Sequence, residues 1–337
     1  MAAWHVALVG ATGIVGEEIL RILEERDFPL DELTLLASRR SAGTRVDFHN
    51  QSYVVRPLTR EALRGVDLVL FAADAETSKM YAPQVVSAGA LVIDCSSAFR
   101  LAPDVPLCVP EINADVLLHH QGIIAMPHSV TIQVSLALAP LHAAAPLKRV
   151  VVSTYQAISD GGRQAVQEFD QQLRDLLNFR PAQADIFPHQ VAFNCLPQCG
   201  DFLDNAYTQD EMALILETRK LLGLPDLPIT ATAAYVPLAH SHSVSVTLET
   251  VQPLSVETAR ALLEQAPGIV LEDDRTRLHY PQAIRASGHD EVFVGRLRAD
   301  LSVPHGLHLW VVTDNLRKGA ALNVVQTAEL LSDALSM

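Results

Sequence analysis

The chain has 337 residues, 49% hydrophobic and 19% charged, which is the composition of a globular protein long enough for two domains. It carries 25 basic and 39 acidic side chains, a formal net charge of −14 that makes nucleic acid and anionic membranes poor partners. No apolar run reaches the roughly 18 residues that span a bilayer, and no basic segment of the signal-peptide kind opens the chain. The four cysteines form no CxxC motif. We therefore expect a cytoplasmic protein with free thiols and no metal site.

Short apolar segments alternate with a helical pattern in the first third of the chain. A helix is predicted over 13–26, where isoleucines and leucines recur at helical spacing. Strands are predicted over 5–10, 33–38, 66–73 and 90–96. This alternation predicts an α/β fold with a Rossmann-like, doubly wound parallel sheet.

Longer segments of alternating pattern follow after about residue 148. They predict strands over 149–159, 228–238, 243–250, 291–300 and 307–315, which are typical of a mixed or antiparallel sheet. A closing helix is predicted over 317–335, and the Pro-rich segment 181–190 is predicted to be an exposed connection. We expect a dinucleotide-binding-like Rossmann domain over 1–132, completed by a C-terminal helix over 316–337. Residues 133–315 are expected to form an α+β dimerisation and substrate-type domain.

A glycine-rich turn, VALVGATGIVGEEIL, joins the first strand to the first helix. Glycines in this context let the backbone approach a pyrophosphate, which then lies at the helix N-terminus. The alternative is a tight turn that binds nothing. The residues of this candidate cofactor loop are Gly10, Thr12, Gly13, Ile14, Val15 and Gly16.

The second strand ends on Ser38, Arg39, Arg40 and Ser41, where an NAD-binding domain places an acid against the ribose. Donors and positive charge without a carboxylate favour NADP as the cofactor. The alternative is a solvated basic turn.

The stretch IAMPHSVTIQVS, residues 124–135, carries the first candidate for catalysis. An apolar strand ends at Ala125, a proline turn follows, and a helix begins near His128 and Ser129. Free backbone N–H groups at a helix N-terminus suit an anion or a nucleophile. Ser129 is therefore either a reactive hydroxyl or the N-cap of its helix.

Several motifs together resemble the aspartate-semialdehyde dehydrogenase family. They include GATGIVG, DCSSAFRLAPDVPLCVPEIN, VSTYQAISDGG, HSHSVSVTLE and TDNLRKGAALNVVQTAELL, in the family's order over nearly the whole chain. The resemblance implies a homodimer that uses NADP and phosphate to interconvert aspartate semialdehyde and β-aspartyl phosphate. In that family a cysteine thiolate forms a thiohemiacetal, passes hydride to the nicotinamide and leaves a thioester that phosphate cleaves.

The resemblance assigns roles to residues that this chain keeps. His242 matches the basic partner of the nucleophile, and Gln156 matches the substrate-side glutamine. Arg100 matches an anion-binding arginine, and Asn315, in TDN, is expected to contact the cofactor. His128, beside the nucleophile position, is a further candidate for contact with the substrate.

Other positions depart from the family pattern. Ser129 stands where the cysteine belongs, and Tyr235 replaces the arginine that binds the substrate carboxylate. Asp210 and Ala213 replace an acid and a lysine, so the lysine that binds phosphate is missing. Two smaller departures replace glycines: Asp74-Ala75 replaces a Gly-Gly pair near the expected nicotinamide, and Ser241 replaces the glycine before the histidine.

These losses fall on three successive tasks of one reaction. They predict a member of a non-catalytic subgroup of the family, a pseudoenzyme with a binding or regulatory role and a small-molecule ligand. Two alternatives remain within dehydrogenase chemistry: an NADP-dependent oxidoreductase for another aldehyde or acyl substrate, and residual aspartate-semialdehyde dehydrogenase activity. A hydrolase that uses Ser129 and His242 is a further alternative.

Overall fold

The computed structural model describes residues 4–336, which form two compact units. The first unit holds the described residues up to Pro127 and from Ala320 onward, and the second holds residues 128–319. The sequence places these divisions at 132/133 and 315/316 instead. The first difference arises because helix α4 (Ser129–Ala144) is continuous and belongs entirely to the second unit. Residues 1–3 and Met337, which the predicted domain includes, lie outside the described residues.

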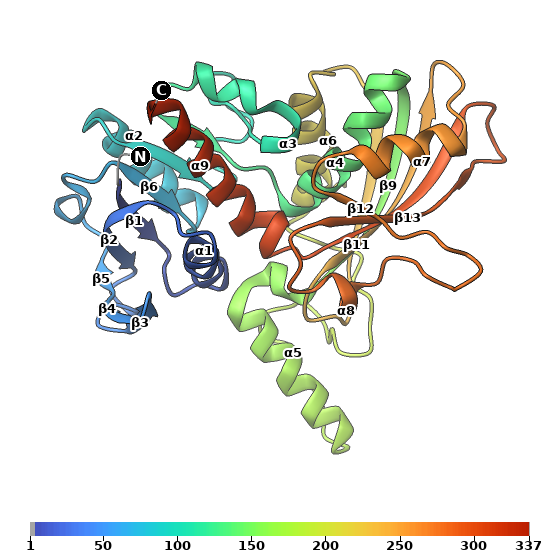
Figure 1. Ribbon diagram of the computed structural model, residues 1–337. Helices are drawn as coiled ribbons and strands as arrows, with labels where there is room; N and C mark the ends of the chain where they lie inside the picture. The colour runs from blue at the N-terminus through green and yellow to red at the C-terminus, as the bar shows by residue number, and fades with distance from the viewer. Residues whose placement is uncertain (1–3, 337) are drawn as a thin grey trace. The chain divides into compact units, whose positions relative to one another are not determined.

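The first unit is built on a six-stranded sheet in which every neighbouring pair is parallel, as predicted (Figure 1). Its order, β5-β2-β1-β6-β7-β8, is that of a doubly wound dinucleotide-binding fold. The strands are β1 (Trp4–Val9), β2 (Leu30–Ala37), β5 (Arg56–Pro57), β6 (Leu68–Phe71), β7 (Leu91–Asp94) and β8 (Ile123–Ala125).

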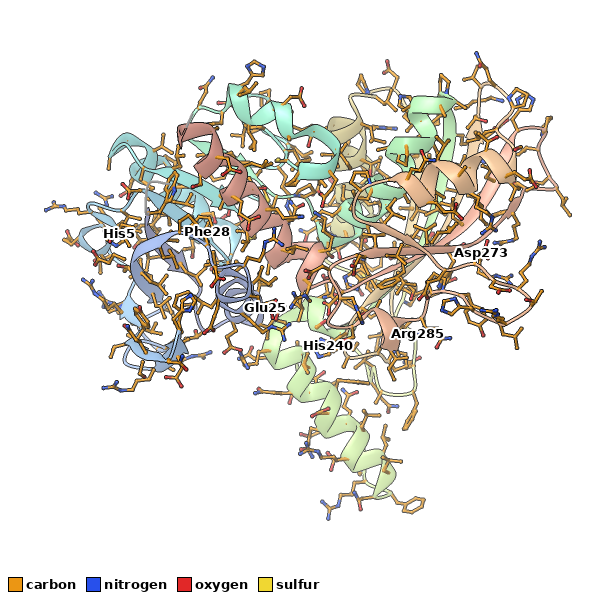
Figure 2. The ribbon with its side chains drawn as sticks, in the orientation of Figure 1. His5, Glu25, Phe28, His240, Asp273 and Arg285 are labelled. Atoms are coloured by element: carbon orange, nitrogen blue, oxygen red, sulfur yellow. The ribbon has the colours of Figure 1, made fainter. Side chains whose placement is uncertain are left out.

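Helices cover both faces of this sheet because successive strand residues point to opposite sides. On β1, Val6 and Leu8 pack into a cluster with α1 (Ile14–Glu25), α9 (Leu322–Ser336) and the buried Phe28 (Figure 2), whereas Ala7 and Val9 pack with α2 (Ala75–Ser87). A hairpin, β3 (Arg45–Phe48) and β4 (Gln51–Val54), lies beside α1. Three shorter helical segments complete the unit: η1 (Glu61–Leu63), α3 (Pro110–Asn113) and η2 (Ala114–His119).

The second unit contains the predicted mixed sheet, in the order β10-β9-β11-β14-β13-β12. The pairs β10/β9 and β12/β13 are parallel, and the three pairs between them are antiparallel. The strands are β9 (Leu147–Gln156), β10 (Ile229–Tyr235), β11 (His242–Thr250), β12 (Ile269–Leu271), β13 (Val292–Ala299) and β14 (Gly306–Thr313).

Helix α4 is the central helix of this unit. It contacts four strands of the sheet, β9, β11, β13 and β14, and two helices, α6 (Gln209–Leu222) and α7 (Val256–Gln265). A helix packed on so many sides has to be apolar around most of its circumference, and nearly all of α4 up to Leu138 is buried. The remaining helical segments are η3 (Ile158–Gly161), α5 (Gly162–Leu177), α8 (Ala283–Ala286) and a π-helical turn at Arg317–Ala321 that leads into α9.

Within residues 4–336, no helix has the length and apolar character needed to cross a membrane.

Candidate active site

Three predicted site residues lie in a row across neighbouring strands of the second unit. Tyr235 at the end of β10 pairs in register with Gln156 at the end of β9. On the other side of β9, Ser243 pairs with Tyr155, so His242 lies opposite Gln156. Paired residues point to the same face of a sheet. The three side chains therefore share one face, and Ser129 of α4 reaches the same place.

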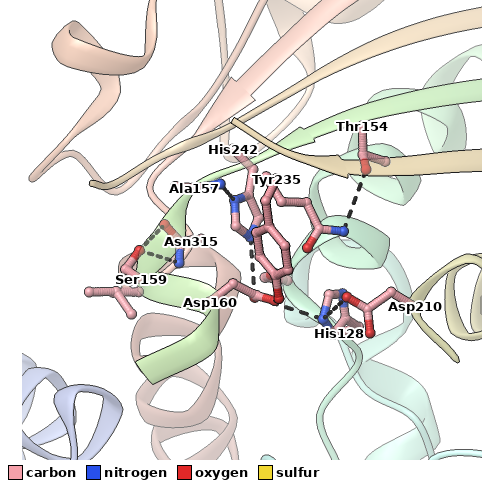
Figure 3. Close-up of polar contacts among 12 residues, drawn as sticks. His128, Thr154, Ala157, Ser159, Asp160, Asp210, Tyr235, His242 and Asn315 are labelled. Atoms are coloured by element: carbon pink, nitrogen blue, oxygen red, sulfur yellow. Dashed lines mark hydrogen bonds and ion pairs between the residues drawn. The ribbon is translucent and has the colours of Figure 1, made fainter. Parts of the chain in front are cut away.

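His242 is held through both ring nitrogens (Figure 3). Its Nδ1 accepts a hydrogen bond from the backbone N–H of Ala157 at 2.9 Å. Its Nε2 lies 3.0 Å from Ser129 Oγ and 3.3 Å from Asp160 Oδ1. Because Nδ1 has to keep its lone pair for the Ala157 N–H, the ring proton is on Nε2. His242 therefore presents a donor to both the hydroxyl and the carboxylate.

Ser129 is the first residue of helix α4, and the N-cap is His128, whose side chain makes no capping bond. The expectation that Ser129 caps its helix is therefore wrong, because its hydroxyl turns to His242 instead. The side chain is buried, with 8% exposure. At this helix N-terminus, Glu217 of α6 accepts the His128 backbone N–H at 2.7 Å. The Glu217 carboxylate thus already accepts one of the backbone N–H groups that could otherwise bind an anion.

Asp160, in η3, is a site residue that sequence reasoning missed. Besides its contact with His242, it accepts a hydrogen bond from the Tyr235 hydroxyl at 3.4 Å (Figure 3). Burial favours a higher pKa for Asp160, but the charge of His128 and the hydrogen bond from His242 outweigh it and lower the pKa below its usual range. Asp160 is therefore a carboxylate at neutral pH and a weak base.

Tyr235 packs its ring against Phe187, with centroids 5.2 Å apart, and is almost fully buried. Burial, followed by the charge of Asp160, raises the pKa of its hydroxyl. The side chain is thus a neutral donor committed to Asp160. It offers none of the positive charge with which an arginine would hold a substrate carboxylate.

Asp210 and His128 complete the polar cluster. His128 Nε2 lies 3.8 Å from Asp160 Oδ1 and 3.8 Å from Asp210 Oδ2, so one imidazole faces two carboxylates (Figure 3). Asp210 is in the first turn of α6, which begins with a reciprocal capping box between Thr208 and Glu211. Ala213 follows in the next turn, without the lysine of the family pattern.

Asn315, expected at the cofactor, lies in the second unit and makes hydrogen bonds there. Its Oδ1 accepts the backbone N–H of Ser241 at 3.0 Å, and its Nδ2 donates to Ser159 Oγ at 3.0 Å. It therefore ties together the segments that carry His242 and Asp160. Ser241 itself has φ of +71°, the left-handed region that favours glycine, which accounts for the glycine of the family pattern.

In the first unit, the predicted cofactor loop has a backbone that requires glycine. Gly10 has φ of +89°, and a Cβ there would lie 2.1 Å from the carbonyl oxygen of Ala72. A Cβ on Gly16 would lie 2.2 Å from the Gly10 oxygen. Gly13 is the N-cap of α1. Close packing of strand, turn and helix is what glycines provide in dinucleotide-binding turns.

The loop and the basic turn lie at the same edge of the sheet. Strands β1 and β2 are parallel and pair as far as Val9 and Leu36, so their carboxyl ends adjoin. The basic turn follows β2. Its residues Ser38, Arg39 and Arg40 are exposed, and Ser41 is partly exposed.

Asp74 and Arg100 have structural partners in the first unit. The carboxylate of Asp74 accepts the Thr77 backbone N–H at 2.9 Å and so caps helix α2, and this bond is the main reason for its lowered pKa. Arg100 is 9% exposed and donates to the carbonyl oxygen of Cys95 at 2.7 Å. Its role towards an anion stays a prediction.

Comparison with known families gives the class first. Residues 5–120 match the model "Semialdehyde dehydrogenase, NAD binding domain", and residues 138–318 match "Semialdehyde dehydrogenase, dimerisation domain". Together they cover most of the chain and correspond to its two sheets. The fold and the matched domains place the chain in the semialdehyde dehydrogenase class of proteins.

The relatives give the particular family. The aspartate-semialdehyde dehydrogenase of Bacillus subtilis is 47% identical over 335 residues, 97% of each chain, and that of Synechocystis is 46% identical over 327 residues, again 97% of each. Aspartate-semialdehyde dehydrogenase II from Vibrio cholerae, in a crystal structure described as complexed with ASA, superimposes with a TM-score of 0.95 at 42% identity over 99% of each chain. The chain belongs to the aspartate-semialdehyde dehydrogenase family.

Proposed function

We propose that this chain is a ligand-binding member of its family that does not catalyse phosphorylating dehydrogenation of aspartate semialdehyde at the rate of an enzyme. One observation carries the proposal: the nucleophile position is a serine that faces the Nε2–H of His242 at 3.0 Å, while Nδ1 is occupied by Ala157. A serine hydroxyl needs a positioned base to attack a carbonyl. His242 offers it a proton instead of a lone pair.

Neither Asp160 nor Cys199 replaces the missing base or thiolate. Asp160 has a lowered pKa and is a weak base. Cys199 feels the charges of Asp210 and Asp160, but burial and the charge of Asp210 raise its pKa, so it stays a thiol at neutral pH. The same tautomer argument opposes a hydrolase, in which the acid and the serine would face different ring nitrogens of the histidine.

The charge of the site also opposes the family's substrates, which the resemblance gives as anions. Tyr235 replaces the carboxylate-binding arginine, and its hydroxyl contacts Asp160. Asp160 and Asp210 both face His128. A substrate carboxylate or phosphate would meet these two acids where the family pattern provides an arginine and a lysine. Like charges at such separations repel strongly in a partly buried site.

The second candidate is the dehydrogenase reaction itself. Its support is the name and similarity of the relatives, 46–47% identical over nearly their whole length, and the Vibrio cholerae enzyme described with ASA. An oxidoreductase for another aldehyde or acyl substrate would need a similar scaffold but no covalent thiol. Both require the nicotinamide cofactor.

We further propose that the first unit binds NADP in preference to NAD and that the protein is a homodimer. The matched NAD-binding domain supports binding of a nicotinamide dinucleotide, and the matched dimerisation domain supports a homodimer. The basic turn with Arg39 and Arg40, which follows β2 without an acid, supports the choice of NADP. Calorimetric titration should give tighter binding of NADP than of NAD, and Arg39→Ala should reduce the difference.

Reversion of the site tests the proposal. Ser129→Cys alone should give no substantial NADP reduction from aspartate semialdehyde and phosphate, because Tyr235 and Ala213 remain. The triple variant Ser129→Cys, Tyr235→Arg, Ala213→Lys should gain activity over it. Ser135→Cys, a buried position on the same helix, is the control for an added thiol. Activity near that of a relative in Ser129→Cys alone would contradict this account of the pocket.

A further inference from the structure

The polar cluster of the second unit has a shape that the family's reaction does not explain. His128, Asp160 and Asp210 come from three separate segments, and each offers one ligand atom within 4.8 Å of the other two. We infer that these three side chains, here called the His128 cluster, bind a divalent transition-metal cation. The cluster shares Asp160 with the surroundings of His242, but it includes neither the nucleophile position nor a residue of the cofactor loop.

The spacing of the ligand atoms suits a cation. His128 Nε2 is 3.8 Å from an oxygen of each carboxylate, which is too long for a direct hydrogen bond. A point equidistant from three atoms with this spacing lies about 2.0–2.5 Å from each, the range of metal–nitrogen and metal–oxygen bonds in proteins. The cluster thus needs little rearrangement to close on an ion.

Gln156 supplies an independent observation that points to the same ligand. Its side chain is 1% exposed, and its Oε1 has no hydrogen-bond partner among the described residues. It emerges between Tyr235 and His242 on the same face of the sheet, and both of these neighbours contact Asp160. A buried amide oxygen without a donor is costly unless something binds it. A cation in the cluster would supply what it lacks.

The ligand types narrow the choice of ion. Two carboxylates and one imidazole form a mixed nitrogen and oxygen set that suits Mn²⁺ or Zn²⁺, and the two negative charges match a divalent ion. The three side chains of the cluster keep 15–17% exposure, so water can reach the site and fill remaining positions. No metal-binding motif is recognisable in the sequence because the three ligands are distributed over residues 128 to 210.

Binding of Mn²⁺ to the full chain, without a polyhistidine tag, tests the inference. The electron paramagnetic resonance signal of free Mn²⁺ should decrease to an endpoint of one ion per chain, and Zn²⁺ should displace it. Asp210→Asn should weaken binding at least about tenfold, as loss of a ligand does. The exposed residues Asp204 and His189 provide the controls Asp204→Asn and His189→Gln, which should bind as the unaltered protein does.

Two results would overturn the inference: no saturable Mn²⁺ binding to folded protein, or Asp210→Asn binding as tightly as the unaltered chain. Asp160→Asn is the second ligand variant, to be interpreted only if its melting transition shows that it folds. Because the readout is bound ion, the outcome is independent of dehydrogenase activity. Absence of Mn²⁺ binding leaves the proposed function untouched. Bound Mn²⁺ would compensate the charges of Asp160 and Asp210 but would not change Ser129 or its contact with His242.

Discussion

His242 is fixed by contacts that also decide what its neighbours can do. The Ala157 N–H on Nδ1 leaves only an N–H at Nε2, and that group faces both Ser129 and Asp160. A thiolate at position 129 would be stabilised by such a donor, whereas a serine hydroxyl gains a hydrogen bond and no activation. With oxygen in place of sulfur at position 129, the same N–H of His242 binds a hydroxyl without activating it.

Asp160 should contribute to stability in a pH-dependent way. Its folded pKa is lower than the ordinary value of 3.8, so its contribution is complete above that value and is lost as pH falls below it towards the folded pKa. Asp160→Asn should destabilise the protein by about 2 kcal/mol at neutral pH, because it removes a charged hydrogen-bond acceptor. Urea unfolding of both proteins, with a chelator present, should give a difference at about pH 5 that is at least as large as at about pH 7, because Asp160 and His128 attract each other most when both are charged. A difference that vanishes between these two values would contradict the assignment.

Ser241 should store backbone strain. It holds φ of +71°, and its hydroxyl is buried without a hydrogen-bond partner among the described residues. Ser241→Gly relieves the strain, whereas Ser241→Ala removes only the hydroxyl. The glycine variant should therefore be more stable than the alanine variant by about 1 kcal/mol in urea unfolding. Equal stability of the two variants would mean that the loop relaxes without cost.

At the scale of the element, helix α6 positions two acids of the site, Asp210 and Glu217. Its first turn is held by the capping box, in which Thr208 N–H donates to Glu211 at 2.8 Å and the Thr208 hydroxyl accepts the Glu211 N–H at 3.4 Å. The other oxygen of Glu211 accepts the Ala233 N–H of β10 at 2.9 Å. The cap thus ties the helix to the sheet.

Removal of this cap should lower stability measurably. Thr208→Ala should cost about 1 kcal/mol in the free energy of unfolding, because a buried N–H loses its acceptor. Thr208→Ser keeps the hydroxyl and should stay close to the unaltered protein. Urea titration of the three proteins makes the comparison, and an alanine variant as stable as the serine variant would show that the hydroxyl contributes little.

The elements that were predicted from sequence are those with a strong local signal. The turn from β1 to α1 has three glycines between an apolar strand and an amphipathic helix, and the strands of the second sheet alternate over many residues. The hairpin of β3 and β4 was missed because its turn uses His49 and Asn50, with φ of 45° and 59°, in place of Asn-Gly. Helix α6 was missed because it is buried on several sides, which blurs its helical period.

The site was only partly predictable for a different reason. Ser129, Tyr235 and His242 were found through motifs. Asp160 lies within the motif VSTYQAISDGG, but the motif does not show that its carboxylate faces His242, and Glu217 lies in no motif. Asp160 and His242, which are in contact, are 82 positions apart in the sequence, and Glu217 and His128 are 89 positions apart. Such contacts depend on the packing of α4, η3 and α6 against one sheet, which no single stretch of sequence encodes.

At the scale of the whole molecule, the proposed homodimer is directly testable. The chain mass is 36.6 kDa, and sedimentation equilibrium should give twice this value. The face of the second sheet opposite α4 exposes Tyr155 beside Trp310, with ring centroids 5.4 Å apart, and this apolar surface suits a second copy. Tyr155→Glu should shift the equilibrium to monomer. An unaltered protein that is monomeric at micromolar concentration would contradict the proposal.

We propose that this family scaffold has lost the phosphorylating dehydrogenase reaction because Ser129 faces the Nε2–H donor of His242. The most direct measurement is phosphate-dependent reduction of NADP by aspartate semialdehyde, with purified protein that shows a cooperative melting transition. We expect no rate above the background without protein. A rate within about tenfold of the enzyme median of roughly 10 s⁻¹ would contradict the claim, and would mean that Ser129 or another group takes the role of the cysteine.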